Sequence, residues 1–243
     1  MTTKVWAHRG ASGYAPENTL RAFEVAIEQK ADGVELDIQL TKDGKVIVIH
    51  DEKLNRVTNG KGFVKNYTLQ ELKKLHCKNV FTEEQNITLP TLDEVFELIE
   101  PTDLTINIEL KTGVFQYPGI EEKAFQTVKK WNMQDRVIYS SFYHPSILII
   151  KEMDSQARVG LLYSDGFLDV AEYANRLGIK ALHPPIWRAI DKNFVKQCKD
   201  YGIALHVWYA DEEEHMKYLV DNKIEAIITN YPDRARNIIA SGC

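Results

Sequence analysis

One stretch of the sequence, Gly33–Asp51, gathers residues whose types and spacing suit hydrolytic chemistry. Glu35 and Asp37 lie two residues apart in an apolar run, and a strand points residues i and i+2 to the same face. The Asp-Gly turn at 42–44, between two apolar runs, predicts a hairpin that brings His50 back to about the level of Asp37. One hairpin therefore gathers two carboxylates and a histidine, which is the layout of a hydrolytic site.

A third acid, Glu109, lies near the end of the apolar run LTINIEL, so the three carboxylates come from two predicted strands. Burying like charges is costly unless something neutralises them. Oxygen ligands alone suit a hard divalent cation, Mg²⁺ or Ca²⁺, whereas zinc is usually accompanied by closely spaced His or Cys. We therefore predict a cation site at Glu35, Asp37 and Glu109. The alternative is a structural salt-bridge layer in which Arg9 or Lys111 neutralises the acids.

His8 and His50 are the candidates for proton transfer, because the ordinary histidine pKa of about 6.5 suits that task near neutral pH. Arg9 follows His8 directly, and Lys111 lies two residues after Glu109. Both cations could contact an anion, Arg through a planar fork and Lys as a point charge. Cations beside a metal-binding acid cluster indicate a phosphate ester as the substrate.

The elements that must position these residues alternate regularly along the chain. Eight strands, each followed by a helical pattern, are expected to begin at Lys4, Gly33, Leu104, Val137, Arg158, Lys180, Ala204 and Ala226. Eight sequential βα units in 243 residues predict an α/β fold of the (β/α)₈ TIM-barrel class, with a doubly wound sheet as the alternative. Residues 52–90 lack this rhythm and are interpreted as a small insertion after the second strand, within a single barrel spanning 1–243.

In such a barrel the site forms where the strands end, which adds three ring-bearing residues to be considered. Trp208 ends the seventh strand and is either the floor of a substrate pocket or ordinary barrel packing. We interpret His206 as a buried, hydrogen-bonded residue and His183 as lining of the mouth rather than a catalyst.

Composition excludes several other classes. A hydrophobic content of 44% and a charged content of 27% are typical of a soluble globular protein, and the formal net charge of −5 argues against a nucleic-acid binder. The sequence contains no apolar run long enough to span a membrane, and its start does not resemble a signal peptide. Three distant cysteines, Cys77, Cys198 and Cys243, are interpreted as reduced thiols. We expect a cytoplasmic protein without stable membrane association and leave open a homodimer.

Short motifs in a fixed order carry a family resemblance. They are His8-Arg9-Gly10, Pro16-Glu17-Asn18-Thr19, Gly33-Val34-Glu35-Leu36-Asp37, Thr41-Lys42-Asp43-Gly44, His50-Asp51, Ile108-Glu109-Leu110-Lys111, Trp208 and Thr229-Asn230-Tyr231-Pro232. In residues, order and spacing the sequence resembles the glycerophosphodiester phosphodiesterases of the bacterial cytosolic type. The resemblance covers the whole chain, with 52–90 matching only as an insertion of the expected place and size.

The resemblance implies a phosphodiesterase-type barrel that uses Mg²⁺ or Ca²⁺ to cleave small glycerophosphodiesters, such as glycerophosphocholine or glycerophosphoethanolamine, to sn-glycerol 3-phosphate and an alcohol. It makes His8 and His50 the acid/base pair, Glu35, Asp37 and Glu109 the metal ligands, Arg9 and Lys111 phosphate contacts, and Trp208 a wall of the glycerol pocket. The sequence departs from the family at Trp208-Tyr209-Ala210-Asp211, where the family usually has Trp-Thr-Val-Asn. Two alternatives are a phospholipase D-like or phosphoinositide lipase-like barrel and a non-catalytic barrel that binds a phosphate ligand. No apolar stretch or basic amphipathic helix suited to a lipid interface is visible in the sequence.

Overall fold

The computed structural model describes residues 2–81 and 86–242. Eight parallel strands form a closed barrel in which each strand pairs with the next and the first pairs with the last. In barrel order these are β1 (Lys4–His8), β2 (Gly33–Leu40), β4 (Thr105–Leu110), β5 (Val137–Ser141), β6 (Val159–Leu162), β7 (Ala181–His183), β8 (Ala204–Val207) and β9 (Ala226–Thr229). The predicted TIM barrel is confirmed, the doubly wound sheet is wrong, and every strand begins within one residue of its predicted start.

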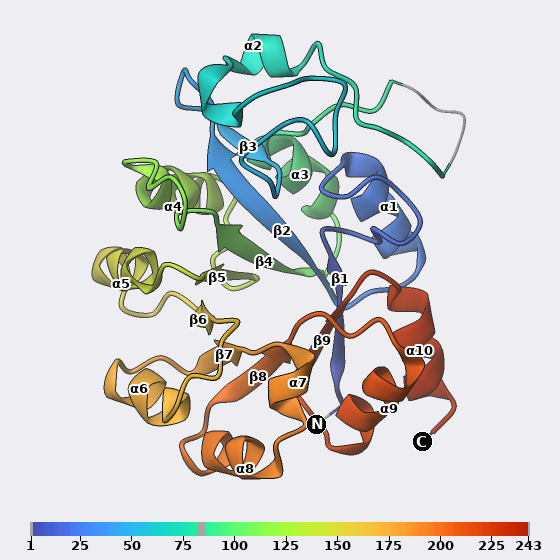
Figure 1. The fold of residues 1–243 in the computed structure, drawn as a ribbon, viewed down its shortest axis with the longest axis vertical. Coiled ribbons are helices and arrows are strands. Elements are labelled where there is room, and N and C mark those ends of the chain that lie inside the picture. Colours follow the sequence, from blue (N-terminus) through green and yellow to red (C-terminus); the bar gives the residue numbers. More distant parts are fainter. Residues whose placement is uncertain (1, 82–85, 243) are drawn as a thin grey trace.

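Helices follow the strands and surround the barrel (Figure 1). The longer ones are α1 (Leu20–Glu28), α3 (Leu92–Ile99), α4 (Ile120–Lys130), α5 (His144–Met153), α6 (Val170–Arg176), α8 (Lys192–Asp200), α9 (Glu213–Asp221) and α10 (Pro232–Ala240). Several of them begin with a side-chain cap. In α3, for example, the Thr91 hydroxyl accepts a hydrogen bond from the Glu94 backbone amide, and the Glu94 carboxylate accepts one from the Thr91 backbone amide. A short helix not predicted from the sequence, α7 (Ile186–Ala189), follows β7. None of the described helices has the length and apolar character needed to cross a membrane.

The predicted hairpin is present, because β3 (Val46–Val48) pairs antiparallel with the end of β2. Gln39 lies opposite Ile47, and the Ile49 amide donates to the Asp37 carbonyl. This register is the one expected from a short turn. It places Ile49 opposite Asp37, so that His50 follows one residue further along the returning chain.

The described residues of the segment 52–90 follow this hairpin and lie beyond β3, at one end of the view in Figure 1. Its described residues include η1 (Val64–Asn66) and α2 (Leu69–Leu72) and no strand of the barrel. Together with Ile47 and Ile49 of the hairpin, they build an apolar cluster separate from the main core, to which the segment contributes Leu54, Val64, Leu72, Cys77, Ile87 and Leu89. Residues 82–85 lie outside the described part of the segment.

Two histidines lie inside the barrel, below the mouth. His206 is 7% exposed and His183 is fully buried, and His206 Nδ1 lies 2.9 Å from His183 Nε2. The expectation for His206 is confirmed, whereas the prediction that His183 lines the mouth is wrong. The physical reason is Gly160: a Cβ at that position would overlap the His183 ring, so only a glycine leaves room for the inward side chain.

This pair gives a testable pH dependence of stability. Burial, with a smaller contribution from Arg158, lowers the pKa of His206 to about 3, while an unfolded chain would protonate it near pH 6.5. The folded state therefore loses stability as the pH falls below about 6.5, by up to about 1.4 kcal/mol per pH unit for this one group, and is unaffected by it above that pH. Urea unfolding between about pH 7 and pH 5 should be less pH-dependent in His206→Gln than in the wild type. A His76→Gln variant, altered at an exposed position, should follow the wild type, and equal slopes in all three proteins would contradict the prediction.

Candidate active site

The three predicted acids meet at the carboxyl ends of β2 and β4. Parallel pairing places Asp37 directly beside Glu109, and the pleat puts Glu35 on the same face as Asp37. All three residues are at most 7% exposed, and one oxygen of each lies within 4.8 Å of one oxygen of the others. Among the described residues this is the only group of three or more His, Cys, Asp or Glu side chains spaced to hold one metal ion.

The cluster carries unneutralised charge. Burial raises the pKa of Glu35 well above its ordinary value, and the charges of Asp37 and Glu109 raise it further. Burial also raises the pKa of Glu109, against the opposing effect of Lys111. Burial would raise the pKa of Asp37 too, but the charges of His50, Arg9 and Lys111 outweigh it, so that this pKa is lowered. Asp37 is thus held ionised, and its charge makes ionisation of the other two acids harder.

Arg9 and Lys111 neutralise the negative charge of the three acids only in part. Lys111 Nζ lies 2.8 Å from Glu109 Oε1 and 3.9 Å from Asp37 Oδ1, while Arg9 Nε lies 3.5 Å from Asp37 Oδ2. Arg9 is shared with Glu17, to which it donates at 2.9 Å. Asp37 Oδ1 is buried and accepts no hydrogen bond from any described residue. A carboxylate oxygen in this state beside two further acids fits a hard cation, so the residues present could hold Mg²⁺ or Ca²⁺.

His8 ends β1 and faces this cluster, with Nε2 4.0 Å from Glu35 Oε2. Its Nδ1 donates to Asn230 Oδ1 at 2.7 Å. Burial, followed by the neighbouring charge of Arg9, lowers the pKa of His8 to about 4, so the ring is neutral near pH 7. Arg9 itself has a left-handed backbone (φ 57°), which turns its amide to donate to Glu35 Oε2 at 2.9 Å. A left-handed backbone is uncommon for arginine, and here it allows the Arg9 amide to donate a hydrogen bond to Glu35 of the acid cluster.

His50 comes from the hairpin and is held by its neighbour. Its Nδ1 donates to Asp51 Oδ1 at 2.8 Å, and Arg56 donates to both oxygens of Asp51. The hydrogen bond from Arg56 is the main cause that lowers the pKa of Asp51, to about 2. The side-chain amide of Gln39 donates to the carbonyls of Ile49, His50 and Asp51, which fixes the backbone around His50.

A cavity of about 230 Å³ lies between the two histidines and the acids. Its lining includes Trp208 and the following residues: His8, Arg9, Glu35, His50, Asn107, Glu109, Phe142, Leu162 and Ile228. A second cavity, of about 430 Å³, shares His8 and Arg9 and continues past Tyr209, Asp211 and Asn230. Six of the eight predicted site residues line the first cavity. The other two, Asp37 and Lys111, are not part of its lining, and Lys111 contacts both Asp37 and Glu109.

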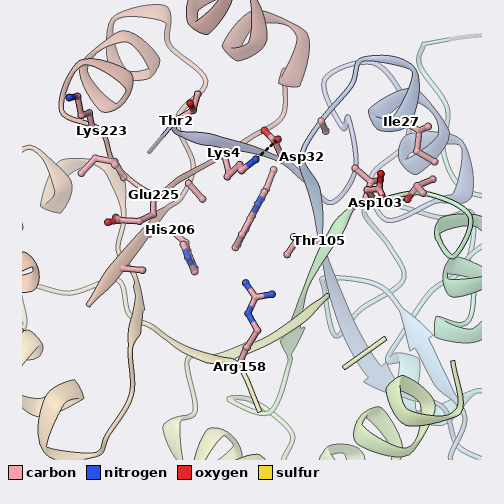
Figure 2. A pocket seen from close by; sticks show the side chains of 17 residues that line it. Thr2, Lys4, Ile27, Asp32, Asp103, Thr105, Arg158, His206, Lys223 and Glu225 are labelled. Atoms are coloured by element: carbon pink, nitrogen blue, oxygen red, sulfur yellow. Dashed lines mark hydrogen bonds and ion pairs between the residues drawn. The ribbon is translucent and has the colours of Figure 1, made fainter. Parts of the chain in front are cut away.

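A larger cavity, of about 810 Å³, opens at the opposite end of the barrel, where the strands begin. Figure 2 shows Arg158, His206 and Thr105 facing this space, with the Lys4–Asp32 ion pair at its edge. Its lining contains none of the eight predicted residues. The amino-terminal end of a TIM barrel generally serves stability rather than catalysis, so we place the site at the other end.

Several site residues escaped the sequence analysis. Asn107 precedes Glu109 by two residues on β4, lines the cavity and has a buried Oδ1 without a hydrogen-bond partner in the described part of the chain. Asn18, also with a left-handed backbone, donates to Asp37 Oδ2 at 2.8 Å. The i, i+2 rule could have found Asn107, whereas Asn18 lies in a loop and entered the sequence analysis only within the Pro16-Glu17-Asn18-Thr19 motif, without a predicted role.

The cysteines take no part in this site. Cys77 and Cys198 are buried free thiols, and burial raises the pKa of each to about 12. A nucleophilic cysteine needs an accessible thiolate, so neither residue is suited to catalysis. Cys243 lies outside the described residues.

Fold and site together define a TIM-barrel enzyme whose chemistry lies at the carboxyl ends of the strands. Comparison with known proteins agrees. Residues 8–234 match the glycerophosphoryl diester phosphodiesterase family. The chain is 45% identical over 243 residues to a glycerophosphodiester phosphodiesterase of Caldanaerobacter subterraneus subsp. tengcongensis, covering all of both chains. It is 41% identical to one of Bacillus altitudinis, covering 97% of this chain and 98% of the relative.

Solved structures agree as well. A phosphodiesterase of Oleispira antarctica, in complex with the product sn-glycerol-3-phosphate, superposes with a TM-score of 0.90 at 29% identity, covering 98% of this chain and 97% of the other. The chain belongs to the glycerophosphoryl diester phosphodiesterase family and is an enzyme of that activity, a phosphoric diester hydrolase.

Proposed function

We propose that the protein hydrolyses small glycerophosphodiesters, such as glycerophosphocholine or glycerophosphoethanolamine, to sn-glycerol 3-phosphate and an alcohol in a metal-dependent reaction with His8 and His50 as the proton-transfer pair. The observation that carries the proposal is the convergence of two histidines, Arg9 and the acid cluster on one cavity. The complex of the Oleispira relative with sn-glycerol-3-phosphate supports the choice of product.

The phosphate is bound by charge at one side of the cavity. Arg9 lines the cavity and can donate from its planar guanidinium to non-bridging phosphate oxygens. Lys111 contributes positive charge next to Glu109. A divalent cation held by Glu35, Asp37 and Glu109 would supply Lewis-acid stabilisation of charge on the phosphate. Fixed donors and cations aimed at developing charge stabilise the transition state without reorganisation.

The two histidines differ in a way that suggests their tasks. His8 is the more buried ring, donates to a neutral amide and is uncharged, so it is suited to accept a proton from the attacking oxygen. His50 donates from Nδ1 to the Asp51 carboxylate, which fixes the orientation of the ring, and we assign to it the protonation of the leaving alkoxide. The attacking oxygen is that of water or of the adjacent glycerol hydroxyl.

One observation favours a second candidate, the phospholipase-like activity. The mouth carries exposed aromatic side chains that the sequence did not reveal: Phe142 is 42% and Tyr209 is 52% exposed. Phe142 contacts Trp208 edge to face, with ring centroids 5.8 Å apart, and both line the cavity. Such a wall could hold either a choline head group or the alkyl part of a lysophospholipid.

One assay separates these functions. Purified protein with added Mg²⁺ or Ca²⁺ should release glycerol 3-phosphate from glycerophosphocholine or glycerophosphoethanolamine, detected by a coupled dehydrogenase. Higher kcat/KM on micellar lysophosphatidylcholine would instead favour the phospholipase-like function. Tight binding of glycerol 3-phosphate without turnover of any of these substrates would favour a non-catalytic binding barrel.

A further inference from the structure

We propose that Asp211 is a positioning residue for His8: acting through Asn230, it determines which ring nitrogen of His8 carries the hydrogen. The inference rests on the proposed role of His8 in proton transfer.

Asp211 lies in the loop after β8 and its carboxylate accepts three hydrogen bonds. Oδ1 accepts from the Thr229 hydroxyl at 2.9 Å and from the Asn230 amide at 2.8 Å. Oδ2 accepts from the side-chain amide of Asn230 at 2.5 Å. Asn230 in turn contacts His8, so the chain of bonds joins the carboxyl ends of three neighbouring strands, β8, β9 and β1.

The direction of these bonds follows from elementary chemistry. An ionised carboxylate can only accept, so the group of Asn230 that faces Asp211 must be the NH₂. The other end of the same amide, Oδ1, must then face His8 Nδ1 at 2.7 Å and Ser12 Oγ at 2.6 Å. A carbonyl oxygen can only accept, so His8 Nδ1 must carry the hydrogen.

This assignment leaves the lone pair of the neutral ring on Nε2. Nε2 faces the acid cluster, 4.0 Å from Glu35 Oε2, and His8 lines both cavities of the mouth. A ring with its hydrogen on Nε2 instead could not accept a proton from a group in the cavity. Asp211 therefore acts on the reaction through the orientation of His8 rather than through the substrate.

Replacing the carboxylate by an amide tests this directly. In Asp211→Asn, Oδ1 can keep the Thr229 and Asn230 backbone donors, and an NH₂ then faces the NH₂ of Asn230. Relief of this donor–donor contact requires Asn230 to turn over and to present its NH₂ to His8, which favours the hydrogen on Nε2. We expect kcat to fall by about 10²–10⁴-fold, the range that proton transfer by a correctly oriented histidine contributes, with KM changed much less.

The double variant Asp211→Asn/Asn230→Asp should restore activity to within about tenfold of the wild type. The amide introduced at position 211 would donate to the carboxylate introduced at position 230, and that carboxylate would accept from His8 Nδ1, so that the path to His8 is remade. A residue with a merely structural role has no reason to show this rescue. Glu212→Gln is the matched control, because it removes an exposed acid from the same loop and should leave kcat unchanged.

The tautomer itself is read by ¹⁵N-detected NMR of the histidine rings above the ordinary histidine pKa of about 6.5, with His8 assigned by its loss in His8→Gln. We expect hydrogen on Nδ1 in the wild type and in the double variant, and on Nε2 in Asp211→Asn. Hydrogen on Nε2 in the wild type, an unaltered tautomer in Asp211→Asn, or an altered tautomer with unchanged kcat would each overturn the proposal. The wild-type spectrum decides even if the variants fail to fold. The spectrum does not depend on turnover. If the proposed activity is wrong but this proposal is right, the protein will be inactive and His8 will still carry its hydrogen on Nδ1.

Discussion

Replacing His8 by alanine is expected to lower kcat by about 10²–10⁴-fold, and replacing His50 should do the same. In the proposed reaction each ring supplies one of the two proton transfers, and the described lining of the cavity holds no third histidine that could take over either task. Because the two transfers serve one reaction, the double variant should be much less impaired than the product of the two single effects. Steady-state kinetics with glycerophosphocholine measures all three.

His76→Ala is the matched control, since His76 is exposed in the 52–90 segment and does not line the cavity. Its turnover should equal that of the wild type. Near-full turnover in both His8→Ala and His50→Ala would contradict the assignment of the pair. A loss confined to KM would indicate that the rings bind substrate rather than transfer protons.

Removal of divalent cations should have an effect at least as large, with kcat/KM falling by about 10³-fold or more in a chelator and returning with Mg²⁺ or Ca²⁺. The physical reason is the partial neutralisation of Glu35, Asp37 and Glu109 by two cationic side chains, which leaves Asp37 Oδ1 without a hydrogen bond from the described residues. Asp37→Asn should cause a comparable loss that added cation does not reverse. Full activity in chelator would favour the salt-bridge layer instead.

Stability provides an independent measure of the same site. A divalent cation at a free concentration of about 100 times its Kd should stabilise the folded state by about 2.7 kcal/mol, which is measured as a rise in Tm. Glu35→Gln should raise the Tm of the cation-free protein, because the raised pKa of Glu35 marks a charge that destabilises the fold at neutral pH. This contribution vanishes as the pH falls below about 4.5, where the unfolded chain also protonates. A lower Tm for cation-free Glu35→Gln at neutral pH would show that the acids are already compensated.

Much of this architecture follows from local chemistry in the sequence. A strand's period of two predicts that Glu35 and Asp37 share a face, and the Asp-Gly turn predicts the return of the chain to His50. Helix caps such as Thr91 and the alternation of apolar runs predict the eight units, because each depends on neighbours within a few residues. The family motifs then identify the activity that the comparisons support.

Only the tertiary structure decided how these pieces act on one another. His183 turns inward because Gly160, on the neighbouring strand, leaves space for its ring, and no spacing along the chain reports that contact. His8 is oriented by Asn230, 222 residues away, because closure of the barrel places the last strand beside the first. The direction of each hydrogen bond in the His8–Asn230–Asp211 chain depends on which groups face each other across three strands. The sequence by itself determines which chemical groups reach the mouth, whereas the order and register of the strands determine which nitrogen of a ring carries a hydrogen.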